Sequence, residues 1–456
     1  MQITKETILK FDRPGPRYTS YPTAPEWSEA VTAEDYRRHL KVFGRTEKSL
    51  SLYIHIPFCE TLCYFCACTM NVRKKEEKYG DQYLDYLEKE MRLVAEAISS
   101  SMTIRQLHWG GGTPSFLSGR QMERLFEMTQ RHFKIDPAGV IAIEIDPRRV
   151  TQSKMRTLKK LGFNRVSIGV QDFDPQVQRT VNRVQPFEEV KRFTGWCRDL
   201  RFKSLNFDLI YGLPFQTGTT FTDTVKKTIE LCPDRIALYS FAHVPWLKKH
   251  QQKLPSDKMP GNEGKLDIFL LARRLFLDNG YKAIAMDHFA LEDDELSRAY
   301  DKGTLYRNFM GYTVKPADEY IGMGTSAIGF LENAFFQNYK TIPEYYHLLD
   351  LDQIPVERGK VLSRDDRIRQ WVIWSLMCRF NLDKSEFEQQ FDCPFDHYFE
   401  EEREHIVACR EDGLLDVVDD GLVVTELGKL FIRNVAMGFD WYLRQATGHK
   451  KFSRTV

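Results

Sequence analysis

The sequence lacks the features of membrane, secreted and nucleic-acid-binding proteins. No run of about 18 apolar residues, the length that spans a bilayer, occurs in its 456 residues. The first residues, Met-Gln-Ile-Thr-Lys-Glu-Thr, contain no apolar signal core. With 65 Lys and Arg against 64 Asp and Glu, the net charge of +1 gives no bulk attraction to nucleic acid or to lipid. These absences predict a cytoplasmic protein with no membrane or nucleic-acid partner.

Cysteine is scarce except in one short stretch. Four of the nine cysteines lie within ten residues, at Cys59, Cys63, Cys66 and Cys68. No second CxxC and no HxxxH occurs elsewhere, whereas structural zinc sites usually pair two distant groups of ligands. Thiolates spaced x3 and x2 suit a [4Fe-4S] cluster that keeps one iron open, with zinc or a disulfide as weaker alternatives. We therefore predict Cys59, Cys63 and Cys66 as ligands and Cys68 as a spare thiol.

From residue 51 onward the sequence alternates between short apolar runs and longer amphipathic ones. Six strand–helix repeats predict parallel strands with right-handed crossovers, and hence an incomplete (β/α)6-type TIM-like barrel of the α/β class. The expected strands are 52–56, 106–109, 140–145, 165–170, 205–210 and 235–241, with 283–286 as a possible seventh. The expected helices are 81–100, 119–132, 151–161, 188–200 and 220–231.

Polar and glycine residues follow the expected strands. In parallel β/α folds the carboxyl ends of the strands meet at one rim, where ligands bind. A run of glycines lets backbone groups approach a ligand, and a carboxylate in an apolar strand is costly unless it is paired. The rim should therefore hold a ligand beside the cysteine loop, contacted by Gly110–Thr113, Glu144, Gln171, Asp208 and Ala242.

Four segments form the expected domain plan. Residues 1–48 are an arm, 49–300 the barrel, 301–361 a rim or linker segment, and 362–456 a mainly helical C-terminal domain that resembles a winged helix. Its expected β-hairpin turns at Asp420-Gly421, and its expected helices include 384–391 and 396–412. The second of these helices is too acidic to act as a DNA recognition helix. Residues 246–280 are expected as a helical excursion with 248–253 solvated, and 322–329 as a loop and turn.

The motifs together resemble a known family. Cys59-x3-Cys63-x2-Cys66 after Tyr53-Ile-His-Ile-Pro-Phe is similar to the cluster motif of radical S-adenosylmethionine (SAM) enzymes. The chain resembles, more narrowly and over nearly its whole length, the oxygen-independent coproporphyrinogen III oxidase (dehydrogenase) family, also called HemN. The segments that carry this resemblance are Gly15–Thr23, Cys68, His108–Pro114, Gly169–Phe173, Asp208–Pro214, Met286–Ala290 and Arg433–Arg444.

The resemblance implies cofactors and contacts. The open iron would bind the amino and carboxylate groups of one SAM, and a second SAM would lie beside the first. Family contacts to the first SAM match Tyr53, Phe65, Gly111, Glu144 and Ile328. Contacts to the second match Gly112, Thr113, Gln171, Arg183, Asp208 and Ala242. The resemblance also makes Tyr53, His55, Met310 and Ile328 catalytic candidates; the family usually has Gln at position 310 and Gly at Ala67.

The implied reaction converts two propionates of coproporphyrinogen III to vinyl groups. A reduced cluster cleaves SAM, the 5′-deoxyadenosyl radical takes a hydrogen from the propionate β-carbon, carbon dioxide leaves, and an electron passes to an acceptor. An electron donor and an acceptor are expected partners of a monomer. A tetracarboxylate needs cations, and we expect Arg17 and Arg307 to supply them.

Three alternatives stay open. The first is a haem chaperone, which in this superfamily usually has Phe at Cys68 and lacks the Arg-Tyr-Thr-Ser-Tyr-Pro arm. The second is an iron–sulfur regulator that uses the C-terminal domain on DNA. The third is a relative acting on another tetrapyrrole, which Met310 leaves possible.

Overall fold

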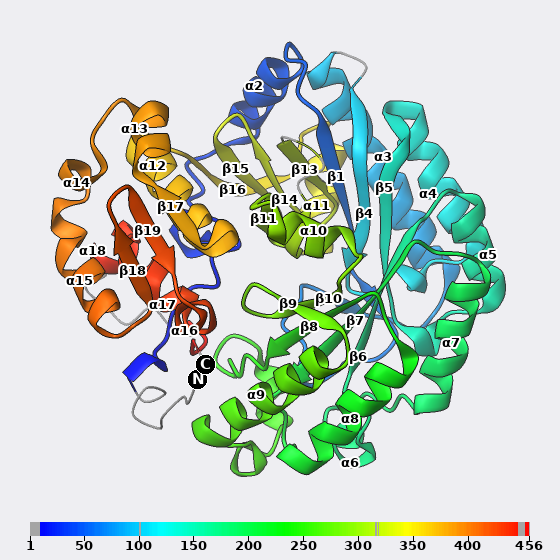
Figure 1. Cartoon of the computed structure of the whole chain (residues 1–456). Helices are drawn as coiled ribbons and strands as arrows, with labels where there is room; N and C mark the ends of the chain where they lie inside the picture. The colour runs from blue at the N-terminus through cyan, green and yellow to red at the C-terminus, as the bar shows by residue number, and fades with distance from the viewer. Residues whose placement is uncertain (1–9, 100–101, 315–316, 318, 446–451, 456) are drawn as a thin grey trace.

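One large sheet organises the computed structural model, which describes residues 10–99, 102–314, 317, 319–445 and 452–455 (Figure 1). Its twelve strands run in the order β16-β15-β14-β13-β1-β4-β5-β6-β7-β8-β10-β9. The six predicted parallel strands are confirmed and lie side by side in chain order. They are β1 (Leu50–Ile56), β4 (Thr103–Gly111), β5 (Lys134–Ile145), β6 (Arg165–Gln171), β7 (Ser204–Tyr211) and β8 (Arg235–Ser240).

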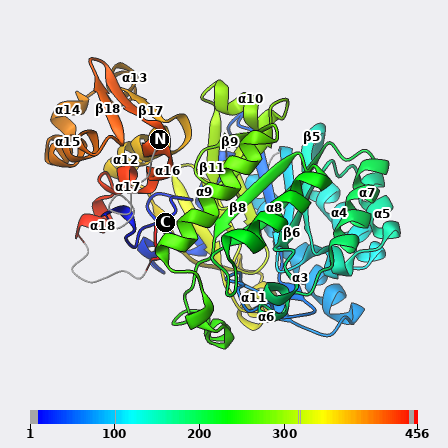
Figure 2. The same ribbon diagram turned by 60° about the horizontal axis from the view of Figure 1, so that its bottom comes forward.

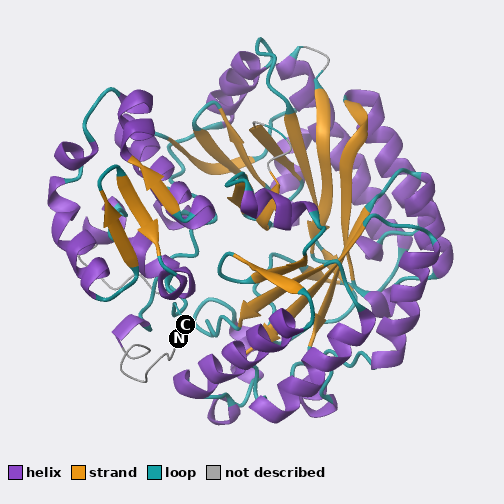
Figure 3. Cartoon of the chain, viewed as in Figure 1, coloured by secondary structure: helices purple, strands orange, loops and turns teal. Residues whose placement is uncertain are grey.

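Helices cover the outer face of these strands (Figure 3). Residues alternate along each strand, so Ile143, Ile168 and Phe207 are fully buried beneath the helices. The residues between them, including Glu144 and Asp208, face the barrel interior. The predicted crossover helices are confirmed within a few residues as α3 (Glu77–Ile98), α4 (Gly119–His132), α5 (Gln152–Lys160), α7 (Phe187–Asp199) and α8 (Gly218–Leu231).

The sheet continues past β1. Strand β13 (Glu319–Met323) pairs with β1 in parallel, and β14 (Ile328–Leu331), β15 (Ala334–Asn338) and β16 (Val356–Val361) follow antiparallel. The loop interpretation of 322–329 is therefore wrong except at 324–327. A Cβ on Gly322 would lie 2.4 Å from the Ile328 carbonyl oxygen, so this glycine permits close strand packing, which a glycine pattern cannot distinguish from a turn.

The other edge also differs from expectation. The predicted strand 283–286 is observed as β9 (Tyr281–Ile284), which ends before Ala285, a residue with a φ of 56°. It does not pair with β8 directly, because the antiparallel strand β10 (His288–Leu291) lies between them. The excursion 246–280 is helical mainly in α9 (Asn262–Asp278), since Pro255 and Pro260 interrupt it. Shorter 3₁₀ turns are η4 (Lys249–Lys253) and η5 (Ser256–Lys258).

The structure also contains smaller helices and strands outside the parallel strands and their crossover helices. They are α2 (Ala33–Phe43), β2 (Phe58–Cys59), β3 (Asn71–Val72), α6 (Pro175–Thr180), α10 (Glu295–Asp301), the hairpin β11 (Leu305–Asn308) and β12 (Gly311–Val314), α11 (Ile342–Asp350) and the 3₁₀ turns η1 (Ala24–Glu26), η2 (Pro114–Phe116) and η3 (Pro147–Arg149). Thr32 caps α2 through a capping box with Asp35.

The C-terminal domain combines helices with a small sheet. The expected hairpin is confirmed as β18 (Leu415–Val418) and β19 (Gly421–Val424), and β17 (Asn381–Asp383) joins it. Its turn is Asp419-Asp420 and not the expected Asp420-Gly421, because Gly421 already pairs with Val418. The helix expected over 396–412 is interrupted, because residues 400–402 form a 3₁₀ turn whose Glu402 is buried. The helices are α12 (Arg364–Trp374), the π-helical η6 (Ser375–Arg379), α13 (Lys384–Phe391), α14 (Phe395–Tyr398), η7 (Glu400–Glu402), α15 (Arg403–Glu411), α16 (Glu426–Leu430), α17 (Ile432–Met437) and α18 (Trp441–Gln445).

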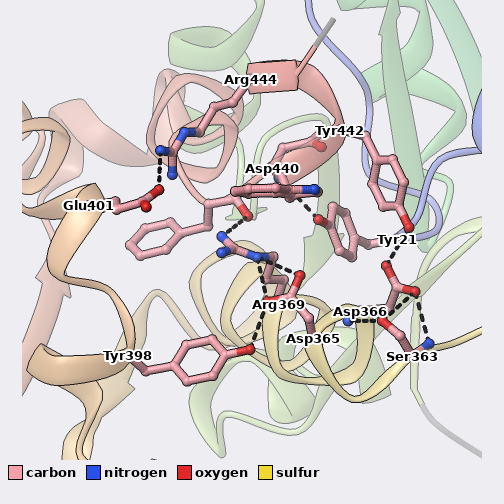
Figure 4. Close-up of polar contacts among 12 residues, drawn as sticks. Tyr21, Ser363, Asp365, Asp366, Arg369, Tyr398, Glu401, Asp440, Tyr442 and Arg444 are labelled. Atoms are coloured by element: carbon pink, nitrogen blue, oxygen red, sulfur yellow. Dashed lines mark hydrogen bonds and ion pairs between the residues drawn. The ribbon is translucent and has the colours of Figure 1, made fainter.

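A buried arginine organises the centre of that domain (Figure 4). Arg369 donates to Asp365 at 2.9 Å, to Glu402 at 2.8 Å and to the Phe439 carbonyl at 3.2 Å. Tyr398 donates to the same Asp365 at 2.7 Å. Because the charge of Arg369 has carboxylate partners on both sides, its burial is compensated and α12, α14 and the C-terminal turn are fixed together.

The N-terminal arm runs between the C-terminal domain and the barrel (Figure 2). Arg433 donates to the Pro16 carbonyl at 2.9 Å, Gln370 to the Tyr21 carbonyl at 2.7 Å, and the Tyr18 hydroxyl to Asp440 at 3.0 Å. The arm is thus an integral layer whose backbone is held by the C-terminal domain.

A buried carboxyl group fixes β13 and β15 against the helix behind them. Glu90 on α3 is fully buried and accepts hydrogen bonds from the Gly324 amide (2.8 Å), Asn338 (2.6 Å) and Tyr345 (2.5 Å). Burial raises the pKa of Glu90 to about 7, and these hydrogen bonds offset only part of that effect.

This carboxyl group predicts a pH-dependent stability. The folded state keeps the proton of Glu90 up to about pH 7, whereas the unfolded chain releases it near 4.5, so stability falls as the pH rises through that window. Up to about 3 kcal/mol is lost. Urea unfolding at pH 5 and 7.5 should therefore show a smaller difference for Glu90→Gln than for the wild type. Glu96→Gln, exposed on the same helix, should behave as wild type; equal differences for all three proteins contradict the assignment.

Candidate active site

The four clustered cysteines lie on a loop that leaves the carboxyl end of β1. The loop borders an open cavity of about 950 Å³, including the space that opens to solvent, and the ends of β4, β5, β6 and β7 form its other walls. Most of the predicted site residues line this cavity: Cys59, Cys63, Phe65, Cys66, Gly111, Gly112, Thr113, Glu144, Gln171, Arg183 and Asp208. The rim predicted from strand order therefore exists.

Neighbouring segments hold the cysteine loop in place. Asn182 donates to the Leu62 carbonyl at 2.8 Å, and the Gln251 side chain donates to the carbonyls of Phe65 (3.0 Å) and Ala242 (3.2 Å). His250 Nε2 lies 2.7 Å from the Cys66 carbonyl. The expectation that 248–253 is merely solvated is wrong, because this segment ties the end of β8 to the cysteine loop.

The cysteines suit a cluster better than a single ion. Among the described residues, no three His, Cys, Asp or Glu side chains converge as a mononuclear metal requires. In a [4Fe-4S] cluster each thiolate binds a different iron, so the ligands stand farther apart. Arg183 and Arg148 lie 3.7 and 3.9 Å from the Cys63 sulfur and place positive charge where a thiolate is needed.

The thiols differ in their surroundings. A hydrogen bond from Cys68 lowers the pKa of Cys66 to about 7, with help from the positive charges of Lys248 and Arg183. Burial raises the pKa of Cys59 to about 12, although Thr113 lies 3.3 Å from its sulfur. Cys68 is exposed.

A chain of hydrogen bonds runs behind the cysteine loop. Burial lowers the pKa of His55, so the ring is neutral. Its Nε2 lies 2.9 Å from the Thr69 carbonyl and must donate there, which leaves Nδ1 to accept from the Tyr53 hydroxyl at 3.1 Å. Tyr83 in turn donates to the His55 carbonyl at 2.8 Å. Tyr53 and His55, two of the catalytic candidates, therefore support the loop from the side of β1.

Glu144 is held ionised beside the glycine run. It accepts from His108 Nε2 at 3.1 Å and from the Gly111 amide at 3.2 Å. Burial opposes its charge, but the hydrogen bond and charge of His108 and the bond from Gly111 together hold the pKa of Glu144 below its usual value. A Cβ on Gly110 would lie 2.9 Å from the carboxylate, so the glycine is required by this close approach.

Asp208 is the second carboxyl group of the inner wall. Ser167 donates to it at 3.2 Å and Asn206 at 2.8 Å. Burial and the negative charge of Glu144 raise the pKa of Asp208 to about 6. The wall thus presents two carboxyl groups as acceptors for ligand hydroxyl or ammonium groups.

Arg183 links the cysteine loop to β6. It donates to the Gly169 carbonyl at 2.6 Å and lies 3.6 Å from Asp146. Its buried Nε atom has no hydrogen-bond partner among the described residues, which leaves one donor for a ligand. Beside it, Gln171 has a φ of 67° at a β-bulge. The bulge turns the Gln171 side chain away from the direction that regular alternation along the strand would give it.

The remaining candidates lie outside the cavity lining. Ala242 is joined to the loop only through Gln251, and Ile328 lies on β14 against the small cluster around Trp27. Met310 is half-buried in the turn between β11 and β12, where its amide donates to Asn308 at 2.9 Å. Sequence reasoning assigned no site role to His108, Ser167 or Arg148, although His108 begins one of the segments that carry the family resemblance.

The two expected substrate arginines meet at the end of β8. Arg17 donates to the Ser240 carbonyl at 2.8 Å, and Arg307 Nε donates to the Arg17 carbonyl at 3.2 Å. Arg307 is buried 3.8 Å from Asp287, and its Nη1 has no hydrogen-bond partner among the described residues. A donor of this kind can still bind an incoming carboxylate.

Comparisons with known proteins agree with this geometry. Residues 53–228 match the model of the radical SAM superfamily, and 362–431 match that of the HemN C-terminal domain. Proteins named oxygen-independent coproporphyrinogen III oxidase from Synechocystis and from Escherichia coli K12 are each 42% identical, over 100% and 98% of this chain and 98% and 97% of their own lengths.

A solved structure matches the whole fold. The coproporphyrinogen III oxidase (HemN) of Escherichia coli, described as a radical SAM enzyme, superposes with a TM-score of 0.90 at 42% identity, covering 93% of this chain and 97% of its own. The fold is therefore the radical SAM fold, and membership of that superfamily implies a [4Fe-4S] cluster and SAM. The chain belongs to the family of oxygen-independent coproporphyrinogen III oxidases, which are radical SAM enzymes of haem biosynthesis.

Proposed function

We propose that the protein oxidatively decarboxylates two propionate side chains of coproporphyrinogen III to vinyl groups, giving protoporphyrinogen IX without oxygen. The observation that carries this is the single cavity shared by Cys59, Cys63 and Cys66 with the polar ends of β4 to β7. The full-length similarity to enzymes named for this substrate supports the choice of porphyrinogen.

The family resemblance divides the cavity residues into two groups. Glu144 lies beside Gly111, and we assign both residues to the first SAM, whose amino group and ribose hydroxyls can donate to the Glu144 carboxylate. Asp208, Gln171 and Arg183 line the same cavity as Gly112 and Thr113, and we assign these five residues to a second SAM. When bound, the reduced cluster and SAM supply a 5′-deoxyadenosyl radical that takes a hydrogen atom from the propionate.

The protein's own groups orient and shield these reactants. The Tyr53–His55–Thr69 chain contains only neutral groups, so it fixes the loop without adding charge beside the cluster. The arm places Arg17 at the end of β8, where it can pair with a substrate carboxylate. The cysteine loop and the ends of β4 to β7, which wall the cavity, also limit the access of water to a reactive radical.

The alternatives predict different behaviour. A haem chaperone should hold haem stably after purification, whereas an enzyme that uses the docked arm for a transient substrate should not. An iron–sulfur regulator should bind DNA, and the exposed carboxylates of Glu400, Glu401 and Glu404 oppose this. A relative acting on another tetrapyrrole would cleave SAM without converting coproporphyrinogen III.

The decisive experiment is anaerobic. Protein reconstituted with iron and sulfide, then supplied with dithionite, SAM and coproporphyrinogen III, should form protoporphyrinogen IX, detected by chromatography after oxidation to the porphyrin. Two carbon dioxide molecules should be released for each product molecule. SAM cleavage without protoporphyrinogen would disprove the substrate assignment and leave the radical chemistry standing.

The cluster assignment predicts which cysteines matter. Cys63→Ser should lose the iron–sulfur absorbance and all SAM cleavage, because one thiolate ligand is removed. Cys68→Ser should keep the cluster, since we assign Cys68 no iron. Cys232→Ser, which changes an exposed thiol elsewhere, is the matched control. Iron and sulfide analysis of the reconstituted variants checks this, and a normal cluster in Cys63→Ser contradicts it.

The substrate arginines make a separate prediction. Arg17→Ala should weaken coproporphyrinogen binding about tenfold, the usual effect of losing one hydrogen-bonded charge, and Arg17→Lys should weaken it less. Arg13→Ala, exposed in the same arm, should bind normally. Equilibrium binding under anaerobic conditions measures this. If both Arg17→Ala and a folded Arg307→Ala bind as tightly as the wild type, neither arginine holds the substrate.

A further inference from the structure

Positive charge is concentrated beside the cysteine loop. Residues 61–75 contain three cations and residues 241–256 contain another three, and neither segment contains Asp or Glu. The chain as a whole has a net charge of only +1. The six cations are Arg73, Lys74, Lys75, Lys248, Lys249 and Lys253. This concentration is a local property that the overall composition conceals.

Contacts place both segments against the loop. Lys248 donates to the Cys68 carbonyl at 3.1 Å, and Lys253 lies 4.9 Å from the centre of the Tyr64 ring. On the other side, the Arg73 amide donates to the Cys59 carbonyl at 2.9 Å, and Lys75 lies 3.7 Å from Glu60. The cations therefore flank the loop that carries the predicted cluster ligands.

Exposed apolar side chains lie among these charges. Leu247 is 67% exposed and Trp246 is 47% exposed, directly before Lys248. Val184 is 56% exposed next to Arg183, and Val72 is 39% exposed next to Arg73. Asn182 and Val181, just before Val184, hydrogen-bond to Leu62 and Tyr64 of the loop. Exposed apolar groups ringed by charge are typical of protein-binding surfaces.

This surface, the loop patch, comprises residues 72–75, Val184 and residues 246–249 and 253. It shares no residue with the described lining of the cavity. It is therefore a separate face, and SAM or substrate within the cavity does not cover it.

We propose that the loop patch is the docking site of an acidic one-electron carrier protein that reduces the cluster. The proposal rests on the proposed function, because reductive SAM cleavage needs an external electron. The reduced carrier gives up one electron and the cluster gains it, with no bond made or broken at the protein. Electron transfer weakens steeply with distance, so docking against the backbone of the ligand loop gives the shortest route.

Charge complementarity favours this partner. An acidic carrier is steered to a basic face, and steering raises association rates by about 10 to 1000-fold at low ionic strength. Apolar contacts of Leu247 and Trp246 with the carrier would then stabilise the encounter complex. A nucleic acid would leave these four apolar side chains without a complementary surface, since its backbone offers only phosphate and sugar.

The test compares two double variants with the same change in charge. Lys74→Glu/Lys249→Glu reverses two exposed cations of the loop patch, and Lys41→Glu/Lys226→Glu reverses two exposed cations on α2 and α8. Each reconstituted enzyme is mixed anaerobically with photoreduced flavodoxin, an acidic flavin protein, and flavin oxidation is followed by stopped flow. Calorimetry with oxidised flavodoxin measures binding, and dithionite-driven SAM cleavage is measured in parallel.

The patch variant should accept electrons from flavodoxin at least about tenfold more slowly at 0.01 M salt, with the deficit shrinking as salt screens the charges. Its binding should weaken likewise, while the α2/α8 variant matches the wild type. Its dithionite-driven SAM cleavage should be unchanged. Equal flavodoxin rates and affinities in all three proteins overturn the proposal. An equal loss of dithionite-driven SAM cleavage in the patch variant also overturns it, because these lysines would then belong to the active site itself. Absence of SAM cleavage in every protein would instead refute the proposed function.

Discussion

The structure depends on holding one irregular loop still at the end of β1. This loop has almost no regular structure of its own, and three thiolates of a bound cluster would add negative charge to it. Its carbonyls therefore receive hydrogen bonds from other segments, from Asn182 after β6 and from His250 and Gln251 after β8. Two arginines near Cys63 supply positive charge. The barrel is the frame that brings these distant donors to one rim.

Much of this frame could be predicted from the sequence. The six parallel strands and their helices follow from alternation and helical periodicity, and the cavity lining follows from the rule that strand ends share a rim. Glu144 and Asp208 were predictable because a carboxylate within an apolar strand needs a partner. These inferences require only local pattern and chain direction.

Other features depended on contacts between distant residues. The strand β13 beside β1 could not be predicted, because Gly322 and Gly324 signal close packing and turns alike. The role of Gln251 was hidden in a polar run that would suit solvent equally well. The helix expected over 396–412 is interrupted because Glu402 turns inward to pair with Arg369, a partner 33 positions away. Sequence periodicity carries no information on such pairs.

The attachment of the arm has a consequence for the order of assembly. Arg433 and Arg454 hold the carbonyls of Pro16 and Asp12, so the arm's partners lie 417 and 442 positions later in the chain. During synthesis the barrel segments emerge and can fold while the arm still lacks its binding surface. The arm can seat Arg17 at the rim only after residues 433–455 leave the ribosome. Until then the Ser240 carbonyl at the end of β8 lacks its Arg17 partner, so this part of the rim is completed last.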